Sequence, residues 1–464
     1  MKAEAASFRD PAGRIYYYQG RVLRTISNDA VGTFDAVQQN ETLRRLVTDE
    51  KIVSSVPVDD VEPPFGLEGV ARVVEHPSLP FVSYPYEWSF SLLKAAALHH
   101  LDLQLALLPS GVSLSDATSY NVQFNGPRPI FIDALSFTQY SEGDYWLAHR
   151  QFCEQFLNPL LLHALVGVPH NDLFRGSLEG LPATTLAELI PFSKKLSWNL
   201  QTHVLAPARM QNRGDATADK AKAATRKPLP RNAYLGLLDQ LRRWIAKLEV
   251  KGMSDTVWGD YEKNNSYCPK EADAKTRAIK EFARTYKPQL MADLGCNSGA
   301  YSEAALDGGA SKVIGFDADH GALEAAYARA VDRKLDFLPL FQDAANPSPG
   351  QGWNGEERAS FIDRCNKVDG LVALAFVHHI AIGRNVPLDK FVDWLCAIAP
   401  RGVVEFVPKE DPMVGALLRL RKDIFPDYTL ENFERLIARH AKVVKSERVT
   451  ETGRVLVTFE RENG

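Results

Sequence analysis

Apolar and polar residues follow two patterns that take turns along the second half of the chain. Short apolar runs typical of buried strands alternate with segments whose apolar residues recur every three or four positions, as in amphipathic helices. This alternation predicts crossover connections and a mostly parallel sheet covered by helices. The predicted strands are 289–293, 311–317, 336–341, 368–377 and 402–407, and the predicted helices are 275–286, a segment from Tyr301, 321–333 and 388–398.

Two more strand-like segments close the chain. They span 441–448 and 454–460 and are joined by the short connection 449–453. So short a connection favours an antiparallel hairpin, which we expect at the edge of the parallel sheet. The fold class predicted for this half is therefore α/β, with seven strands and a terminal antiparallel hairpin.

The first half has a different pattern, with short strands around 14–27 and 70–83 and a helix over 87–108. We expect an α+β domain there. Residues 208–231 are rich in Ala, Lys, Arg and Asp without apolar periodicity, which is typical of an exposed linker. An amphipathic helix follows over 234–248. The expected organisation is an N-terminal domain over 1–207, a linker with an amphipathic helix over 208–254, and the α/β domain over 255–464.

Composition narrows the class of protein. The chain of 464 residues is 45% hydrophobic and 24% charged, which fits a globular protein, and its net charge of -4 carries no footprint for duplex nucleic acid. The net charge does not exclude a local basic groove. The five cysteines lack C-x-x-C spacing, which argues against a disulfide framework and a zinc site. With no apolar leader and no membrane-length apolar run, we expect a cytoplasmic protein without a membrane span.

The segment Asp293 to Gly299 carries the main chemical signal. An acidic residue ends a buried strand, and Gly295 and Gly299 follow where the chain must turn tightly and let a ligand approach its backbone. Asn297 stands where a dinucleotide fingerprint has its second glycine for the pyrophosphate. The spacing therefore lowers the weight of NAD and favours S-adenosylmethionine, which has no phosphates.

Two acidic residues at the ends of the next strands extend this signal. Asp317 follows the second strand, about twenty positions on, where a carboxylate can accept hydrogen bonds from ribose hydroxyls. Asp343 follows the third strand and can accept from the exocyclic amine of adenine. The alternative for Asp343 is an ordinary surface turn residue.

At this point the sequence resembles the class I S-adenosylmethionine-dependent methyltransferases from about Trp258 to its end, because three motifs occur in order at suitable spacing. It resembles more narrowly the host-specific nodulation (NoeA-like) methyltransferases. That narrower likeness is carried by the segments 376–382 (FVHHIAI), 404–409 (VEFVPK) and 423–429 (DIFPDYT). The resemblance implies a Rossmann-like fold, S-adenosylmethionine as cofactor and methyl transfer to an acceptor.

Other polar and aromatic residues are candidates for the acceptor side. His378 and His379 follow the fourth strand, and we expect one of them to line the acceptor site as a base, the alternative being packing beneath the loop. Glu405 and Lys409 either face the same crevice or form a salt bridge. Tyr261 and Tyr267, with Trp258, form either a lid over the cofactor or ordinary core.

Absent motifs bear on the acceptor. Neither an N-P-P-Y segment nor a Pro-Cys nucleophile follows the fourth strand. A small-molecule, lipid or glycan acceptor is therefore favoured over nucleic acid or protein. The competing hypotheses are a bifunctional methyltransferase-kinase acting on a glycan or lipid, a nucleic-acid or protein methyltransferase, and a non-catalytic nucleoside-binding module. The sequence does not indicate an oligomeric state.

The N-terminal half contains a spacing that resembles protein kinases. Asp116, Asn121 five residues later and Asp133 after a strand-like Ile130-Phe131-Ile132 would converge on Mg²⁺ and phosphates. The usual His-Arg before the first Asp, the Phe-Gly after the last and the glycine-rich loop are missing. We expect no resident metal elsewhere. The alternative is a β-hairpin whose Asp and Asn serve turn geometry, and acceptor recognition or regulation is the expected role of this half.

Overall fold

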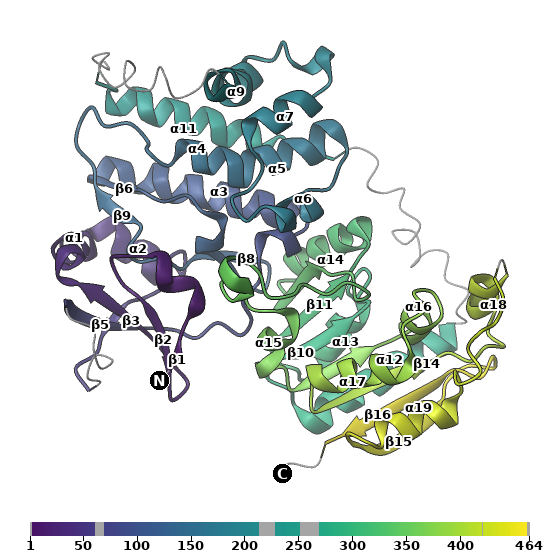
Figure 1. Ribbon diagram of the computed structural model, residues 1–464. Helices are drawn as coiled ribbons and strands as arrows, with labels where there is room; N and C mark the ends of the chain where they lie inside the picture. Colours follow the sequence, from purple (N-terminus) through teal and green to yellow (C-terminus); the bar gives the residue numbers. More distant parts are fainter. Residues whose placement is uncertain (1, 61–68, 213–227, 251–268, 420, 462–464) are drawn as a thin grey trace. The chain divides into compact units, whose positions relative to one another are not determined.

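The computed structural model describes residues 2–60, 69–212, 228–250, 269–419 and 421–461 (Figure 1). The chain divides into two compact units. Unit 1 comprises Met1–Lys251 with Gly352–Arg358, and unit 2 comprises Gly252–Gln351 with Ala359–Gly464. Among the described residues, no helix combines the length and apolar character needed to cross a bilayer. The predicted lid residues Trp258, Tyr261 and Tyr267 lie outside the described residues.

Unit 2 is built on a seven-stranded sheet in the order β12-β11-β10-β13-β14-β16-β15. The first five strands of the order are parallel, and β16 pairs antiparallel with both β14 and β15. The predicted α/β class, the seven strands and the terminal hairpin are therefore confirmed. The strands are β10 (Met291–Leu294), β11 (Val313–Asp317), β12 (Phe337–Phe341), β13 (Gly370–Ala373), β14 (Arg401–Phe406), β15 (Lys442–Arg448) and β16 (Val455–Glu460).

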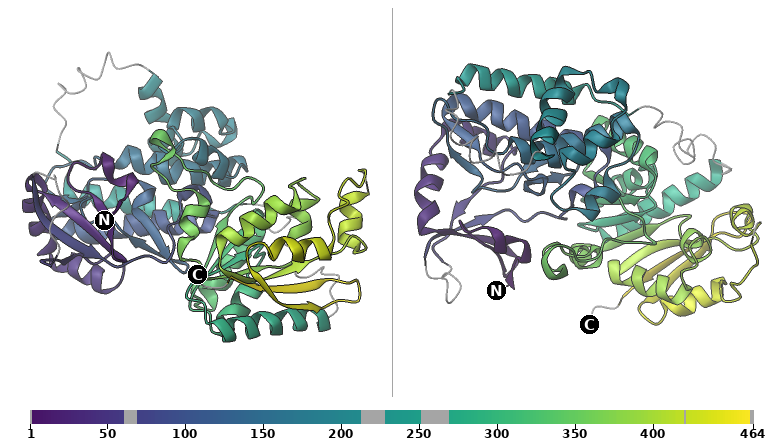
Figure 2. Two further views of the ribbon diagram at one scale, coloured as in Figure 1. Left: turned by 60° about the horizontal axis from the view of Figure 1, so that its bottom comes forward. Right: turned by 45° about the horizontal axis from the view of Figure 1, so that its top comes forward.

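Helices cover both sides of this sheet (Figure 2). Apolar side chains of α12, α13 and α14 share one buried cluster with the central strands, because their apolar residues recur at helical spacing and face the sheet. The helices of unit 2 are α12 (Pro269–Tyr286), α13 (Ala300–Gly308), α14 (His320–Asp332), α15 (Phe361–Arg364), α16 (Val377–Ala381), α17 (Leu388–Ile398), α18 (Pro412–Leu418) and α19 (Leu430–Ile437).

One predicted strand of unit 2 is wrong in its extent. The sequence predicted a strand over 368–377, whereas β13 ends at Ala373 and α16 begins at Val377. The chain turns between them because Ala375 adopts φ 49°, in the left-handed region. The apolar run is continuous because both the strand and the following helix are buried, so periodicity alone could not separate them.

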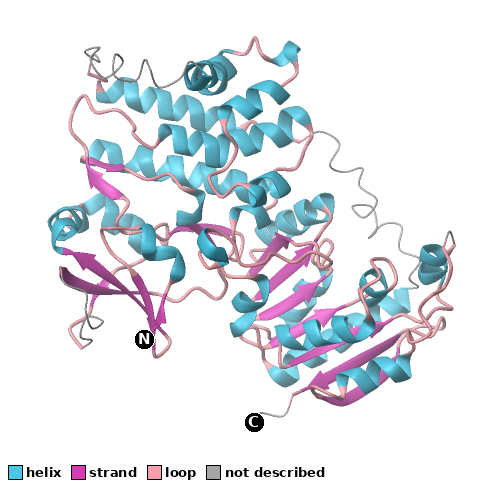
Figure 3. Ribbon diagram, in the orientation of Figure 1, coloured by secondary structure: helices cyan, strands magenta, loops and turns pink. Residues whose placement is uncertain are grey.

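Unit 1 is α+β, as predicted: its strands lie within residues 2–139 with α1, α2 and α3 between them, and helices follow from His149 on (Figure 3). Its antiparallel sheet has the order β1-β2-β3-β5-β4, and two further pairs join β6 with β9 and β7 with β8. The strands are β1 (Lys2–Ala3), β2 (Ile15–Tyr18), β3 (Arg21–Ser27), β4 (Val56–Pro57), β5 (Val70–His76), β6 (Val112–Leu114), β7 (Val122–Asn125), β8 (Arg128–Phe131) and β9 (Phe137–Gln139).

Two predicted segments of unit 1 differ in detail from the structure. The strand-like segment 14–27 is a hairpin, because Gln19 and Gly20 both adopt positive φ and reverse the chain. The segment 70–83 is a strand only as far as His76. The predicted helix over 87–108 spans Phe90–Leu107 as α3, with Ser89 as its N-cap accepting from the Leu92 N–H.

The remaining helices of unit 1 include three single π-helical turns. The α-helices are α1 (Asn28–Gln38), α2 (Glu41–Thr48), α4 (His149–Phe152), α5 (Asn158–Leu161), α6 (Asn171–Gly176), α7 (Ala183–Leu189), α8 (Trp198–Leu200), α9 (Ala206–Asn212) and α11 (Arg231–Ala246), and the π-helical turns are η5 (Cys153–Leu157), η6 (Leu162–Val166) and η8 (Gln201–Leu205).

The amphipathic helix α11 packs on α3 within unit 1. Tyr234 accepts a hydrogen bond from the Gln104 amide at 2.9 Å, and Arg242 pairs with Asp102. Part of the basic face of α11 is thus engaged by an acidic residue of unit 1. The sequence set 208–254 apart as a linker with a helix, and the structure groups its described residues with unit 1.

Candidate active site

The glycine turn after β10 lies where the strand order of the sheet reverses, since β11 flanks β10 on one side and β13 on the other. Gly295 and Gly299 have φ of +74° and +82°. A Cβ at Gly299 would lie 2.5 Å from Cε1 of Phe337, so both backbone conformation and space require glycine there. In doubly wound sheets this reversal point, at the carboxyl ends of the strands, is where ligands bind.

Asp317, at the end of β11, is held against this turn by backbone N–H groups. The Asn297 N–H donates to Oδ2 and the Asp319 N–H donates to Oδ1, both at 2.9 Å. Burial raises the pKa of Asp317, and the backbone N–H donors partly offset that rise. Because a carboxylate offers about four lone-pair sites, Asp317 can still accept from hydroxyl groups of a ligand.

Asp293 is buried between β10 and α13, where its Oδ2 accepts from the Ser302 hydroxyl at 2.6 Å. Burial raises the pKa of Asp293 to about 7, and the nearby Asp317 carboxylate raises it further while the Ser302 hydrogen bond opposes the rise. The side chain therefore ties the glycine turn to the helix that follows it.

Asp343 stabilises its own turn, because its Oδ1 accepts from the Ala345 N–H at 2.9 Å. Its Oδ2 lies 3.6 Å from a guanidinium nitrogen of Arg384. The preceding Gln342 is buried, and its side-chain nitrogen has no hydrogen-bond partner among the described residues. Our sequence interpretation gave the adenine contact to Asp343 and gave Gln342 no role, although a polar residue directly after a buried strand is a readable signal.

The two histidines expected at the acceptor side lie in α16 with their rings 4.2 Å apart. His378 is 1% exposed, and neither of its ring nitrogens has a hydrogen-bond partner among the described residues. Burial, His379 and Arg454 lower the pKa of His378 to about 2. His379 is half-buried, and burial also lowers its pKa. Both rings are therefore neutral at physiological pH.

A buried ion-pair network lies at the base of the loop before α16. Lys275 of α12 contacts Glu405 of β14 at 2.7 Å, and Glu405 also accepts from the Ala375 N–H at 2.8 Å. Both charged side chains are at most 1% exposed. Arg454 lies 3.5 Å from Glu405 and donates to Asp411 at 2.7 Å. Glu405 therefore holds the strained turn at Ala375.

Salt bridges decide between the alternatives for Glu405 and for Lys409. Glu405 forms a buried ion pair with Lys275, and Lys409 pairs with Asp423 at 2.8 Å. Lys275 was missed from the sequence, because 130 positions separate it from Glu405 and it reads as one of several lysines on a polar helix.

In unit 1 the kinase-like residues come together from separate segments. The Asn121 amide nitrogen lies 3.3 Å from Asp116 and 3.4 Å from Asp133. Asp133 is also bonded by the Arg24 guanidinium and the Ser136 hydroxyl. The β7–β8 hairpin lies between Asn121 and Asp133, and Asp116 accepts from the Thr118 N–H of its own turn at 3.0 Å. These residues therefore lie close together, as the kinase-like spacing requires, and Asp116 also stabilises its own turn, as the alternative predicted.

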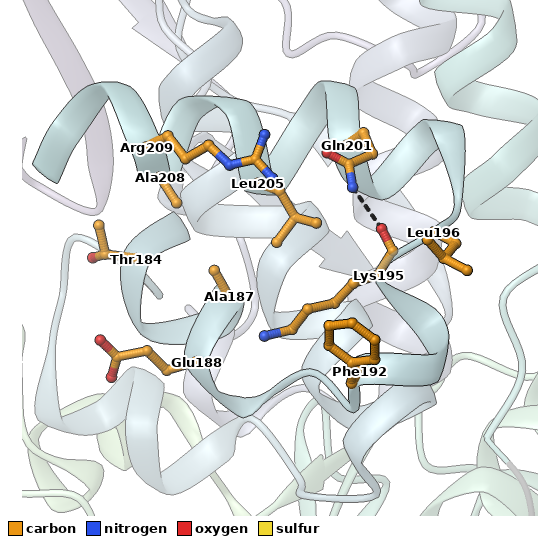
Figure 4. A pocket seen from close by; sticks show the side chains of 10 residues that line it. All are labelled: Thr184, Ala187, Glu188, Phe192, Lys195, Leu196, Gln201, Leu205, Ala208 and Arg209. Atoms are coloured by element: carbon orange, nitrogen blue, oxygen red, sulfur yellow. Dashed lines mark hydrogen bonds between the residues drawn. The ribbon is translucent and has the colours of Figure 1, made fainter. Parts of the chain in front are cut away.

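A hollow of about 370 Å³ lies in another part of unit 1, lined by residues of α7, the 3-10 helix η7 (Phe192–Lys194), η8 and α9 (Figure 4). The Lys195 side chain extends into it, and the Gln201 amide donates to the Lys195 carbonyl at 2.7 Å. Phe192 and Leu196 at its rim are each 83% exposed. None of the residues singled out in the sequence lines this hollow.

The strand order of unit 2, numbered within the unit, is 3-2-1-4-5-7-6 with strand 7 antiparallel, and its first strand leads into the glycine turn that Asp317 supports. This is the fold of the class I methyltransferases. Within that class the chain belongs to the family of the nodulation protein NoeA. It is 44% identical over 461 residues to NoeA of Rhizobium meliloti (strain 1021), covering 98% of this chain and 96% of that protein. No protein-family model matches the sequence.

Two of the solved structures to which the chain is similar are methyltransferases. The bifunctional kinase-methyltransferase WbdD is 15% identical, with 47% of this chain and 46% of that chain covered and a TM-score of 0.31. The magnesium protoporphyrin IX methyltransferase ChlM of Synechocystis PCC 6803, with bound SAH, is 15% identical, with 49% and 95% covered and a TM-score of 0.30.

Proposed function

We propose that unit 2 binds S-adenosylmethionine at the turn after β10 and transfers its methyl group to a small-molecule, lipid or glycan acceptor. The observation that carries this proposal is the arrangement of Asp317, whose carboxylate is fixed by two backbone N–H groups at the reversal point of the sheet and keeps acceptor capacity. A ribose with two hydroxyl donors matches that capacity.

The other residues at this edge fit the same ligand. Gln342, buried at the end of β12 with an unpartnered side-chain amide nitrogen, suits a ring nitrogen acceptor of adenine, and Asp343 follows it directly. Phe376 lies next to Gly295, where a Cβ would meet its ring at 3.0 Å. A flat aromatic side chain beside the turn can pack against an adenosine.

The acceptor's proton is the remaining requirement. When bound, S-adenosylmethionine supplies a sulfonium methyl group that is already activated, so this chain's residues have to align the acceptor and accept its proton. His379 is the better base of the pair, because it is half-buried while His378 is enclosed. A neutral imidazole can accept a proton, and the ion-pair network through Glu405 fixes the loop that carries it.

Isothermal titration of the full chain with S-adenosylmethionine and with S-adenosylhomocysteine tests the cofactor assignment. We expect both to bind, and we expect Asp317→Ala to weaken binding at least tenfold. Asp332→Ala, an exposed carboxylate at the end of α14, is the matched control and should bind as the unaltered chain does. Absence of binding by both compounds would overturn the proposal.

Transfer of a radiolabelled methyl group into bacterial extract tests the acceptor class. We expect label in the small-molecule, lipid or glycan fraction and about a hundredfold slower labelling by His379→Ala with cofactor affinity retained. Label in protein or nucleic acid would replace our acceptor class with that one. An equal loss of labelling and of cofactor affinity in His379→Ala would contradict its role as a base.

A second candidate function, nucleotide binding by unit 1, has one specific observation in its favour. Asp116, Asn121 and Asp133 converge although Asp133 is 12 residues from Asn121 along the chain. Arg24 of β3 pairs with Asp133 from the antiparallel sheet, so any metal ion there would compete with a guanidinium. Titration with ATP and Mg²⁺ tests this function: it predicts binding that Asp133→Ala abolishes, and no heat with the unaltered chain would exclude it.

A further inference from the structure

Three metal-ligating side chains meet in unit 1, away in sequence from every residue discussed for cofactor or nucleotide binding. They are His149 at the start of α4, Cys153 at the start of η5 and His203 within η8. One ligand atom from each lies within 4.8 Å of the other two. His149 and Cys153 are four residues apart and share one face of a helix, while His203 comes from a separate helical segment.

The distances suit a tetrahedral metal ion. Nε2 of His149 lies 3.1 Å from Nδ1 of His203 and 3.6 Å from Sγ of Cys153. With zinc bonds of 2.3 Å to sulfur and 2.0–2.1 Å to nitrogen, tetrahedral angles place the sulfur and a nitrogen about 3.6 Å apart and two nitrogens about 3.3 Å apart. The two separations that involve His149 agree with these values to within a few tenths of an ångström, and the third pair, Cys153 and His203, lies within 4.8 Å.

Hydrogen bonding among the three side chains accounts less well for the same geometry. Nε2 of His149 faces both the sulfur of Cys153 and the nitrogen of His203. A single ring nitrogen offers either one lone pair or one hydrogen, so it makes one good hydrogen bond and leaves the other neighbour poorly satisfied. A cation at the common centre satisfies all three atoms together.

Aromatic side chains hold the two histidine rings in place. Trp146 meets the His149 ring edge-on at 5.6 Å between centroids, and Trp244 stacks on His203 at 6.0 Å.

Among the described residues the cluster contains no carboxylate, which bears on the choice of metal. The Glu154 carboxylate is bonded by Arg150 and by the Gln211 amide, both at 3.0 Å. One sulfur and two imidazole nitrogens favour a borderline or soft ion over Mg²⁺ or Ca²⁺. His149 is partly exposed and provides a route of entry.

We propose that His149, Cys153 and His203 bind one Zn²⁺ ion, with the fourth position open to water or another ligand. Binding converts the Cys153 thiol to a thiolate and releases one proton to solvent. The cysteine spacing of the sequence argued against zinc because it tests for C-x-x-C pairs, and this set holds one cysteine and two histidines, of which His203 lies 54 positions from His149.

The zinc ion would brace a loop of unit 1. Gln155, in the π-helical turn that begins at Cys153, accepts from the Ser119 N–H at 2.9 Å and the Ser119 hydroxyl at 2.7 Å. Gln151, between His149 and Cys153, accepts from the Ala117 N–H at 2.9 Å. Fixing this helix through the metal therefore fixes the segment after Asp116, and π-helical turns commonly occur at functional positions.

The test uses the full chain, reduced and freed of metal with a chelator, and titrated with Zn²⁺ and with Co²⁺. We expect one ion per chain, a rise in melting temperature with Zn²⁺, and for Co²⁺ the visible absorption of a tetrahedral ion with a sulfur-to-metal band in the near ultraviolet. Cys153→Ser should lose the sulfur band, and His203→Ala should weaken Zn²⁺ binding at least tenfold.

Cys396→Ser and His440→Ala are the controls and should behave as the unaltered chain does, since Cys396 lies in α17 and His440 pairs with Asp393. The Co²⁺ spectrum of the unaltered chain shows whether the ion is bound through sulfur, even where a variant fails to fold. A spectrum without the sulfur band, no Zn²⁺ binding, or Zn²⁺ binding by Cys153→Ser and by His203→Ala as tight as that of the unaltered chain would overturn the proposal.

Discussion

Asp133 of unit 1 and Asp317 of unit 2 are both acidic residues that follow a strand, yet their carboxylates are held in different ways. Asp133 is bonded by the side chains of Arg24, Asn121 and Ser136 as well as by one backbone N–H. The two N–H donors bonded to Asp317 both belong to the backbone. A carboxylate neutralised by a guanidinium is a structural anchor, whereas one fixed by backbone N–H groups stays available to a ligand. The spacing of acidic residues alone does not distinguish the two.

The pKa values of the two carboxyl groups are shifted in opposite directions. Burial would raise the pKa of Asp133, but the Arg24 guanidinium and the Ser136 hydroxyl hold it below its ordinary value. In Asp317 burial prevails over the backbone donors and the pKa is raised. Asp133 therefore favours folding when ionised, and Asp317 does not.

Removing the counter-charge of Asp133 should have the largest effect on stability. Arg24→Ala leaves a buried carboxylate without its ion-pair partner, and we expect a loss of about 3–5 kcal/mol in the free energy of unfolding. Arg72→Ala, in the same sheet, breaks a half-exposed pair with Asp35 and should cost at most about 1 kcal/mol. Denaturant titration measures both, and Arg24→Ala/Asp133→Ala should recover part of the loss. Equal costs for Arg24→Ala and Arg72→Ala would contradict the view of Asp133 as an anchor.

A smaller loss is expected from Gly299→Ala in unit 2. The new Cβ meets Phe337, and the alanine must adopt a positive φ. We therefore expect a destabilisation of roughly 1–3 kcal/mol together with weaker cofactor binding. Gly415 in α18 has open space around the same position and an ordinary φ, and Gly415→Ala should leave stability unchanged or slightly improved. Thermal unfolding of the two variants compares them, and a neutral Gly299→Ala would show that the turn is less constrained than the structure indicates.

The effect at a single pH is smallest for Asp293, because its contribution to stability changes with pH. The pKa of Asp293 is raised to about 7 in the folded chain, against an ordinary value of 3.8, so the folded state keeps a proton that the unfolded chain has lost. This contribution to stability is complete below about pH 4 and is lost as the pH rises through about 7. Asp293→Asn should remove a slope of at most about 1.4 kcal/mol per pH unit between pH 5 and pH 7. Identical pH profiles for the two proteins would show that Asp293 is ionised in the folded state.

Local pattern was enough to predict the sheet of unit 2. Each strand is a short apolar run that ends in a turn signal. The residues of the glycine turn and Asp317 belong to one βαβ unit, so their spacing along the chain predicts that they lie close together. The pairings that involve distant segments were not predictable. Arg24 is 109 positions from Asp133, and no periodic pattern marks either as a partner of the other.

The histidines of α16 show a second limit. Their position after a buried strand indicated that a ring faces the ligand side, but burial of His378 depends on how α16 packs under the loop that Glu405 holds. That packing is set by tertiary contacts rather than by the residues near His378. The same holds for the set of His149, Cys153 and His203, which forms only when two helical segments meet.

The most direct test of the account is the binding of S-adenosylhomocysteine to the full chain, measured by calorimetry on Asp317→Ala and Asp133→Ala side by side. Our account predicts that Asp317→Ala weakens binding at least tenfold, whereas Asp133→Ala, once shown to be folded, binds as the unaltered chain does. Binding that survives Asp317→Ala, or that is lost equally in both folded variants, would contradict it.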